Sequence, residues 1–383
     1  MAFGIICEYN PFHNGHLHQI NEIKRMSDEP IICVMSGNFT QRGEVAVIDK
    51  YARAEMAIRA GADLVLELPV PFCLSSAEYF AAAGVYILNS LGVDKLCFGS
   101  ESANADEIIR VAGIACSGEF KQKCESLSKS EGNAAAYFTL LANEAGLEGI
   151  LSNDILGIEY AKAIIKNGYE MQIYPIKREG SAYREISLTA GEFPSASAIR
   201  ETLQKKDENA ICDFVPASTL EILKNSELAT LERVGGGIIL SLRLTRPEEL
   251  DVAISDSGLV NRIISLSQNA SSLDSLEREV QTKKYTSAAI RRAMLYIILG
   301  IKQSDLDSSP TYTTLLGANE RGREYLSAIR KSERMLDIVT KPASAKECRQ
   351  LELDKRADAL YSMCFENKKS SGFCTTKSPF ITK

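Results

Sequence analysis

Near its start the sequence reads Phe3-Gly-Ile-Ile-Cys-Glu-Tyr-Asn-Pro-Phe-His-Asn-Gly-His-Leu-His18, and all three histidines of the 383-residue chain lie in this segment. The apolar residues 3–7 predict a buried strand, and residues 17–26 predict the helix that follows it. The histidines therefore lie on a strand-to-helix turn. Such a turn presents free backbone N–H groups and the positive end of a helix dipole, which suits a bound phosphate.

His13 and His16 flank Gly15 in an H-x-G-H pattern. Gly15 has no side chain, so a ligand could approach the backbone closely at this point. The plain alternative is one surface imidazole and one or two buried, hydrogen-bonded ones. The position of the cluster on the turn favours a binding site over this alternative.

Outward from this segment, short β-type runs alternate with helical ones through the first half of the chain. This alternation predicts βαβ units and a parallel sheet of the Rossmann-like α/β class. Helix limits are marked by Asp49 as an N-cap, by Gly61 and Gly92 at helix ends, and by a Ser75-x-x-Glu78 capping box. The expected strands are residues 3–7, 31–35, 64–66, 95–98 and 171–175, and the further expected helices are residues 50–60, 77–91 and 153–166.

After Leu203 the strand signal fades and helical periodicity dominates. The tail after Asn367 is of low complexity, and we expect it to be mobile. We therefore expect two domains, a Rossmann-like domain over residues 1–205 with a helical insertion at about 106–144, and a mainly α-helical domain over residues 206–383 with helices at 228–244, 288–299 and 323–338.

The composition is that of a globular protein, with 45% hydrophobic and 25% charged residues and a net charge of −6. This charge argues against wholesale coating of nucleic acid but allows a local basic patch. The ten cysteines form no C-x-x-C pair, which predicts reduced thiols rather than disulfides or zinc ligands. The sequence shows no signal-peptide pattern and no long apolar span, so we expect a cytoplasmic protein without membrane contact.

A second motif, Phe193-Pro-Ser-Ala-Ser-Ala-Ile-Arg200, leads into a helix far along the chain. Hydroxyl residues at a helix start, with an arginine one turn in, describe an anion site, although Ser195 could be only a helix cap. Together with H-x-G-H, the motif resembles the two phosphate-binding elements of the nucleotidylyltransferase superfamily. In that chemistry a nucleophile attacks the α-phosphate of ATP. We expect His13 and His16 to stabilise the charge that develops, and Ser195, Ser197 and Arg200 to hold the departing phosphates.

Further segments resemble the tRNA(Met) cytidine acetate ligase family. They are residues 4–16, Met35-Ser-Gly-Asn-Phe-Thr-Gln-Arg-Gly43, Phe98-Gly-Ser-Glu101, Ser152-Asn-Asp154 with Gly157, Ile176-Lys-Arg178, Lys283-Lys-Tyr-Thr286 and Leu316-Gly317. The resemblance implies activation of acetate by ATP to acetyl-adenylate, and then acetylation of the wobble cytidine of elongator tRNA(Met). It also implies a Rossmann-like nucleotidyltransferase domain and a tRNA-binding helical half.

By this resemblance, ATP contacts fall on the first loop and helix and on three later positions. The sequence departs from the family pattern at Leu17-His18-Gln19, where an aromatic residue followed by histidine is expected, so His18 has a surface alternative. The residues implied as ATP contacts are Cys7, Glu8, Tyr9, Asn10, Pro11, Phe12, His13, Asn14, Gly15, His16, Leu17, His18, Gln19, Ile20, Gly99, Asn153 and Arg178.

Each later position also has a structural interpretation. Gly99 could serve only a turn, although nucleotides bind at the carboxyl ends of parallel strands. Asn153 could be a helix N-cap or could hydrogen-bond an adenine edge. Arg178 is a phosphate clamp or a solvated surface charge. Arg42 and Lys50 could meet the tRNA or phosphates, or could equally be solvated charges.

The helical half carries Lys283, Lys284, Arg291 and Arg292 beside Tyr285. Four positive charges can neutralise phosphates and an aromatic ring can stack an unpaired base, so we expect tRNA contact here. Short basic runs can also be simple solvated faces. A weaker second strip consists of Arg321, Arg323, Arg330, Lys331 and Arg334.

The sequence therefore predicts an ATP-dependent acetate–tRNA ligase, with Mg²⁺ expected as the partner of ATP but no protein ligand for it identified. Two alternatives stay open. One is a small-molecule adenylyltransferase, against which the size of the helical half argues. The other is a non-catalytic RNA-binding protein that senses a nucleotide, against which the intact motifs argue.

Overall fold

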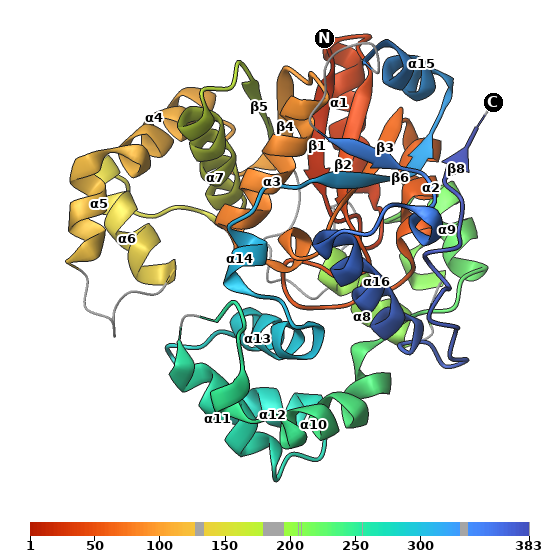
Figure 1. The fold of residues 1–383 in the computed structure, drawn as a ribbon. Coiled ribbons are helices and arrows are strands. Elements are labelled where there is room, and N and C mark those ends of the chain that lie inside the picture. The colour runs from red at the N-terminus through yellow and green to blue at the C-terminus, as the bar shows by residue number, and fades with distance from the viewer. Residues whose placement is uncertain are drawn as a thin grey trace.

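The computed structural model describes residues 1–126, 134–178, 195–205, 207, 209–254, 256–329 and 336–382. At its centre is an eight-stranded sheet in the order β5-β4-β1-β2-β3-β6-β7, with β8 paired to β6 (Figure 1). The strands β1 to β5 run parallel to one another, which confirms the expected α/β sheet. The strands are β1 (Phe3–Cys7), β2 (Ile31–Ser36), β3 (Leu64–Leu68), β4 (Lys95–Ser100), β5 (Gln172–Lys177), β6 (Tyr312–Ala318), β7 (Asp337–Val339) and β8 (Phe380–Ile381).

Four helices connect the parallel strands. Right-handed crossovers place α1 and α2 on one face of the sheet and α3 and α7 on the other, and α3 packs beside α7 and on β1 and β2. These helices are α1 (Asn14–Met26), α2 (Lys50–Ala60), α3 (Ala77–Ser90) and α7 (Ser152–Asn167). The expected helical segment after β4 forms α4 (Ala105–Cys116), α5 (Gly118–Glu125) and α6 (Ala134–Ala145).

Local signals set the helix ends with mixed accuracy. The Asp49 carboxylate accepts the backbone N–H groups of Tyr51 and Ala52 at the start of α2, and Gly61 ends that helix with a φ of 111°. The capping box predicted at Ser75 is wrong. The Ser75 hydroxyl instead donates to the Phe72 carbonyl, and Ser76 is the N-cap of α3.

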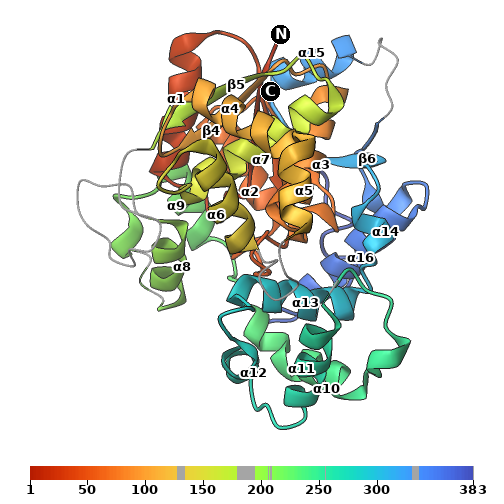
Figure 2. The same cartoon turned by 90° about the vertical axis from the view of Figure 1, so that its left-hand side faces the viewer.

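A separate group of helices, α10 to α13, has a hydrophobic core of its own, formed by residues such as Ile238, Leu242, Ile263, Leu276 and Ile290. We call it the helical unit. Figures 1 and 2 place it at the end of the molecule opposite the N-terminus. It consists of α10 (Gly235–Leu244), α11 (Ser257–Ser267), α12 (Leu273–Val280) and α13 (Ser287–Leu299), which follow α8 (Ala196–Gln204) and α9 (Ala217–Lys224).

The expected domain boundary needs correction, because the chain after the helical unit returns to the sheet. β6 runs antiparallel to β3, so the part from residue 206 onward is not one helical domain. The helix expected over residues 323–338 is also wrong at its end, since Asp337–Val339 forms β7. The remaining helices are α14 (Gln303–Leu306), α15 (Glu320–Ile329) and α16 (Arg349–Ser362), and short 3₁₀ turns occur at Phe72–Leu74, Asn209–Ile211, Leu231–Val234, Pro247–Glu249 and Pro342–Ser344.

The tail after Asn367 is packed rather than mobile. Cys374 is fully buried in the main core, the Lys377 ammonium lies 2.8 Å from the Asp49 carboxylate, and β8 pairs with β6. Low sequence complexity misled the prediction, because these small and polar residues satisfy their contacts against α2 and the sheet. None of the helices in the described part of the chain is both long and apolar enough to cross a membrane.

Candidate active site

His13 and His16 lie where β1 ends and α1 begins. His13 is the N-cap of α1, and its Nδ1 accepts the backbone N–H of Gly15 at 3.1 Å. The Nδ1 of His16 accepts the backbone N–H of His13 at 3.2 Å. The two imidazole rings stack with centroids 3.7 Å apart, and His16 also packs against Tyr9. The two histidines therefore form a reciprocal cap, in which His13 is buried and His16 is half-buried.

Both imidazoles are neutral at physiological pH. Burial lowers the pKa of His13 to about 3, with further lowering by the positive charges of Arg178 and Arg200. Burial also lowers the pKa of His16, followed by the influence of His13 and Arg178. Because each Nδ1 accepts a hydrogen bond, the single ring proton resides on Nε2. Each histidine thus offers a neutral Nε2–H donor, which is suited to an oxygen that gains negative charge.

The second motif meets the first loop in space. Ser195 is the N-cap of α8 and accepts the backbone N–H of Ala198. Arg200 donates to the Asn10 carbonyl at 3.1 Å and to the Ser197 hydroxyl at 3.1 Å. The two motifs, 190 residues apart in sequence, therefore form one site. Phe193 and Pro194 lie outside the described residues.

Gly99, Asn153 and Arg178 form a third part of the site, at the ends of β4 and β5. A Cβ atom on Gly99 would lie 3.2 Å from Cγ of Arg178, so the arginine side chain runs across the glycine. The Nη1 of Arg178 donates to Oδ1 of Asn153 at 2.9 Å. Asn153 is the second residue of α7 and is not its N-cap, which is Leu151.

Arg53, which could not be recognised from the sequence, stabilises the loop after β1 through hydrogen bonds to backbone carbonyls. Its guanidinium is fully buried and donates to the backbone carbonyls of Glu8, Ser36, Gly37 and Ile48. These carbonyls belong to the ends of β1 and β2 and to the start of α2. A buried arginine can hold several carbonyls at once because its five donors are rigidly arranged. Its position in an amphipathic helix gave no local signal of this role.

The other residues implied as ATP contacts differ in their burial and in their hydrogen bonds. Tyr9, Asn10 and Phe12 are buried in the loop after β1. Burial raises the pKa of Cys7, which favours the protonated thiol over the thiolate. Burial also raises the pKa of Glu8, whose side chain accepts the backbone N–H of Gln41. The remaining implied contacts lie in the same loop or in α1. Gln19 donates to the Cys97 carbonyl, Ile20 is in the core, and His18 lies near Glu22. Pro11, Asn14 and Leu17 complete the set.

The comparisons with known proteins agree with this geometry. The model of the HIGH Nucleotidyl Transferase family matches residues 1–374. The tRNA(Met) cytidine acetate ligase of Caldanaerobacter subterraneus is 37% identical over 390 residues, covering 96% of both chains. The ligase of the same name from Acetivibrio thermocellus is 35% identical over 399 residues, covering 96% of this chain and 95% of that one. This chain belongs to the tRNA(Met) cytidine acetate ligase family.

Two crystal structures of Thermotoga maritima TmcAL are similar over the whole length of both chains. The apo form has a TM-score of 0.90 at 32% identity. The form bound with alpha-thio ATP has a TM-score of 0.87 at 31% identity. The resemblance to the acetate ligase family, inferred from the motifs, is therefore confirmed for sequence and fold.

In this acetate ligase family member, most of the basic residues expected at tRNA are engaged within the chain. Arg291 contacts Glu44 at 2.6 Å and Glu277 at 2.6 Å, and Arg292 donates to the Gln41 carbonyl at 2.9 Å. They tie α13 to the loop after β2. Lys284 pairs with Asp256 at 2.6 Å, whereas Lys283 is exposed.

Two further expectations concerned Lys50 and the weaker basic strip as contacts for phosphates or tRNA. Lys50 is buried between Glu67 and Asp358, 2.7 and 2.9 Å away, so it is not a contact for phosphates or RNA. Of the weaker strip, Arg321 lies near Asp28 and Arg323 follows it in α15. Arg330, Lys331 and Arg334 lie outside the described residues.

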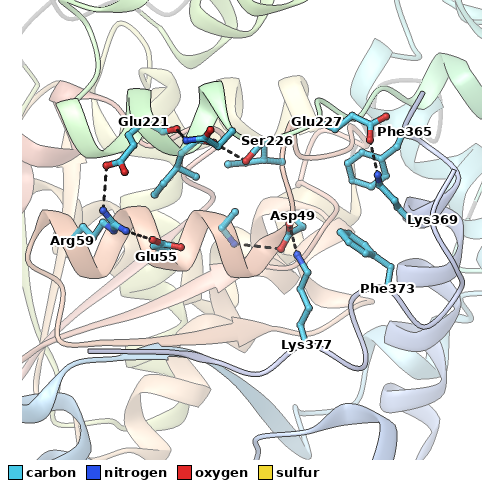
Figure 3. Close-up of a pocket in the computed structure, with 14 residues that line it drawn as sticks. Asp49, Glu55, Arg59, Glu221, Ser226, Glu227, Phe365, Lys369, Phe373 and Lys377 are labelled. Carbon is cyan, nitrogen blue, oxygen red and sulfur yellow. Dashed lines mark hydrogen bonds and ion pairs between the residues drawn. The ribbon is translucent and has the colours of Figure 1, made fainter. Parts of the chain in front are cut away.

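A cavity of about 450 Å³ lies away from the histidines, between α2, α9 and the C-terminal segment (Figure 3). Its charged side chains pair with one another. Arg59 lies between Glu55 and Glu221, Lys369 faces Glu227, and Lys377 faces Asp49. None of the implied ATP contacts lines this cavity. Within the described residues there is also no group of three or more histidine, cysteine or acidic side chains placed to hold a metal ion.

Proposed function

We propose that this protein activates acetate with ATP to acetyl-adenylate and then acetylates the wobble cytidine of elongator tRNA(Met), forming N4-acetylcytidine. The observation that carries the proposal is the meeting of two neutral histidines with Arg178 and Arg200 at the carboxyl ends of β1, β4 and β5. Membership of the acetate ligase family, and the nucleotide analogue bound by its relative from Thermotoga maritima, support it.

In the first step, a carboxylate oxygen of acetate forms a bond to the α-phosphorus of ATP, and the bond to the bridging oxygen of pyrophosphate breaks. Acetate is already ionised at neutral pH, so this step needs no base. The Nε2–H groups of His13 and His16 donate to the α-phosphate oxygens as charge develops there. Arg200 and the Ser195 and Ser197 hydroxyls hold the departing pyrophosphate.

In the second step, the exocyclic amine of cytidine attacks the acetyl carbonyl carbon, and AMP leaves with the oxygen that joined it to the acetyl group. The amine loses one proton. We assign no residue to that proton. Mg²⁺ is proposed to enter with the ATP phosphates, because the described residues offer no cluster of side chains that would hold the ion on their own.

For tRNA we propose contact through Lys283 and Lys284, at the connection between α12 and α13. Both side chains are exposed, and Tyr285 lies beside them with the Lys284 ammonium 5.2 Å from its ring. Arg291 and Arg292 are instead proposed to hold the helical unit in place. Charge reversal of Lys283 and Lys284 should flatten the dependence of tRNA affinity on salt concentration. An unchanged slope removes them from the interface.

The activity is tested by incubating the protein with ATP, labelled acetate and bulk tRNA. Acetate-stimulated pyrophosphate release and labelled N4-acetylcytidine in digested RNA are expected. Stimulation by a different acceptor supports the adenylyltransferase alternative, and no release at all supports the nucleotide-sensing RNA-binding protein. Full turnover by the His13→Ala, His16→Ala double variant would exclude the catalytic role of the histidines.

A further inference from the structure

The carboxylate of Glu101 lies where the end of β4 meets the first turn of α7. Its oxygens accept the backbone N–H of Asn153 at 3.0 and 3.2 Å and that of Asp154 at 3.1 Å. The Oε1 atom also accepts a hydrogen bond from Nδ2 of Asn153 at 2.6 Å. One carboxylate therefore caps α7 and also forms a hydrogen bond with the side-chain amide of Asn153.

This hydrogen bond fixes the orientation of the Asn153 side-chain amide. A carboxylate can only accept hydrogen bonds, so the NH₂ end of the amide must face Glu101. The oxygen end then faces the opposite side, where Nη1 of Arg178 donates to it at 2.9 Å. The stem of Arg178 lies against Gly99, where a Cβ would meet it at 3.2 Å. Glu101, Asn153 and Arg178 thus form a polar relay with one defined direction.

The loop that carries Glu101 is itself held firmly. The Asp154 carboxylate accepts the backbone N–H groups of Glu101 and Ser102, each at 3.1 Å, and the hydroxyl of Ser100. The loop and the helix therefore cap each other through Glu101 and Asp154. This reciprocal cap sets the relay relative to the sheet, because Ser100 is the last residue of β4.

We propose that Glu101 is a positioning residue of the nucleotide site, which orients Asn153 so that Asn153 holds Arg178 above Gly99. Glu101 does not touch the nucleotide in this proposal and acts only through the relay. The inference rests on the proposed function, because it takes Arg178 to serve a phosphate of ATP.

The test exploits the direction of the relay. In Glu101→Gln the glutamine can still cap α7 through its oxygen, but its NH₂ group favours the reverse orientation of Asn153. The Asn153 NH₂ would then face Arg178, and two donors repel. Adding Asn153→Asp restores an acceptor on both sides and leaves the net charge as in the wild type. Asp106→Asn, in the exposed first turn of α4, is the matched control for the loss of one carboxylate.

In an equilibrium binding measurement with ATP, Glu101→Gln should raise the dissociation constant about tenfold, and the double variant should return it to within about threefold of the wild type. Asp106→Asn should leave it unchanged. A second measurement needs no nucleotide. The chain has only three histidines, so their ring proton signals in NMR can be followed individually as pH is varied.

Arg178 is among the groups that lower the pKa values of His13 and His16. Releasing Arg178 in Glu101→Gln should therefore raise both pKa values. Wild-type ATP affinity with unchanged histidine titrations in this variant, or no recovery in the double variant, overturns the relay. A wild-type protein that fails to bind ATP refutes the proposed function instead, and the histidine titration still tests the relay.

Should Glu101→Gln fail to fold, Asn153→Ala provides the second variant. It leaves the Glu101 carboxylate in place to cap the backbone of α7 and removes only the amide that reaches Arg178. The same rise in the pKa values of His13 and His16 is expected. Unchanged titrations of both histidines in this variant overturn the proposal.

Discussion

At the residue scale, the two histidines of the H-x-G-H turn have a structural role on Nδ1, and the chemical role that we propose for them falls on Nε2, the opposite ring nitrogen. Nδ1 of His13 caps α1, and Nε2–H is left for a ligand. An asparagine at the same position can still cap the helix, but it cannot place a donor where Nε2 lies. The two roles can therefore be separated by substitution.

We expect His13→Asn to lower kcat for adenylate formation by about 10²- to 10³-fold, the usual loss for one donor to a developing oxyanion. Its free energy of unfolding at pH 7 should change by only about 1 kcal/mol, because the cap remains. Steady-state kinetics and urea unfolding measure the two effects. An unchanged kcat in His13→Asn would show that the Nε2–H group of His13 does not act on the reacting phosphate.

The depressed pKa of His13 also has a pH signature. The folded pKa of about 3 lies below the ordinary value of 6.5, so between these values the unfolded state binds more protons. The stabilisation is therefore complete above pH 6.5 and is lost as the pH falls towards 3. At pH 5 the loss from this residue is about 2 kcal/mol relative to pH 7. Urea unfolding of His13→Asn at both pH values should show a pH-dependent loss smaller by this amount.

The site shows how far single residues could be inferred. The histidines, Ser197 and Arg200 could be proposed as site residues because their motifs are local, and the structure brings the two motifs together. Arg53 and Glu101 were not identified. Their partners are mostly backbone groups of strand ends and helix starts, which no residue pattern displays.

At the element scale, the helical unit is joined to the α/β part through α13. Gly43, with a φ of 73°, lies directly beneath this helix. A Cβ there would come within 2.6 Å of Cβ of Arg291 and 2.8 Å of the Arg292 backbone nitrogen. Glu44 next to it contacts both Arg200 and Arg291. The loop after β2 therefore contacts both the proposed nucleotide site and the helical unit.

Gly43→Ala should destabilise the protein because the new methyl group collides with α13. Gly92→Ala is a close control, since Gly92 has almost the same φ, 72°, and no atom within 4 Å of its Cβ position. Both variants carry the same backbone strain. The free energy of unfolding of Gly43→Ala should be lower than that of Gly92→Ala by about 1–3 kcal/mol, the usual cost of overpacking. Equal free energies of unfolding for the two variants would show that α13 can shift away from the new methyl group without destabilising the protein.

Elements differed in how well they could be predicted. The limits of α2 were predicted correctly because Asp49 is a local start signal for a helix and Gly61 a local stop signal. β6 was missed, although Tyr312-Thr-Thr is typical of a strand, because helical segments surround it in sequence. Its partner β3 lies about 250 residues earlier, and only that pairing makes the segment a strand.

At the scale of the whole molecule, one buried lysine links the two ends of the chain. Burial lowers the pKa of Lys50, but Asp358 and Glu67 raise it by more, so the ammonium stays charged. Asp358 also accepts from the Asn38 side chain, and Asp354, one turn earlier in α16, accepts the Val70 backbone N–H. α16 is thereby fixed to the strand ends β2 and β3.

Lys50→Met should cost about 3–5 kcal/mol, because two buried carboxylates lose their counter-charge. Lys377→Met removes a pair with Asp49 that is one-third exposed on the lysine side, and it should cost about 1 kcal/mol or less. Urea unfolding at pH 7 measures both. Similar losses for the two lysines would show that the buried network does not hold the C-terminal segment.

The arrangement around Lys50 also dictates the order of events during synthesis. Lys50 and Asp358 are 308 residues apart, and β6 and β8 join the sheet only from the last part of the chain. Until residues 312–381 have left the ribosome, the edge of β3 has no partner strand. The Lys50 ammonium then lacks Asp358, one of its two carboxylate partners. A nascent chain that stalls before β6 therefore presents the unpaired edge of β3, and unpaired strand edges are prone to pair with another chain.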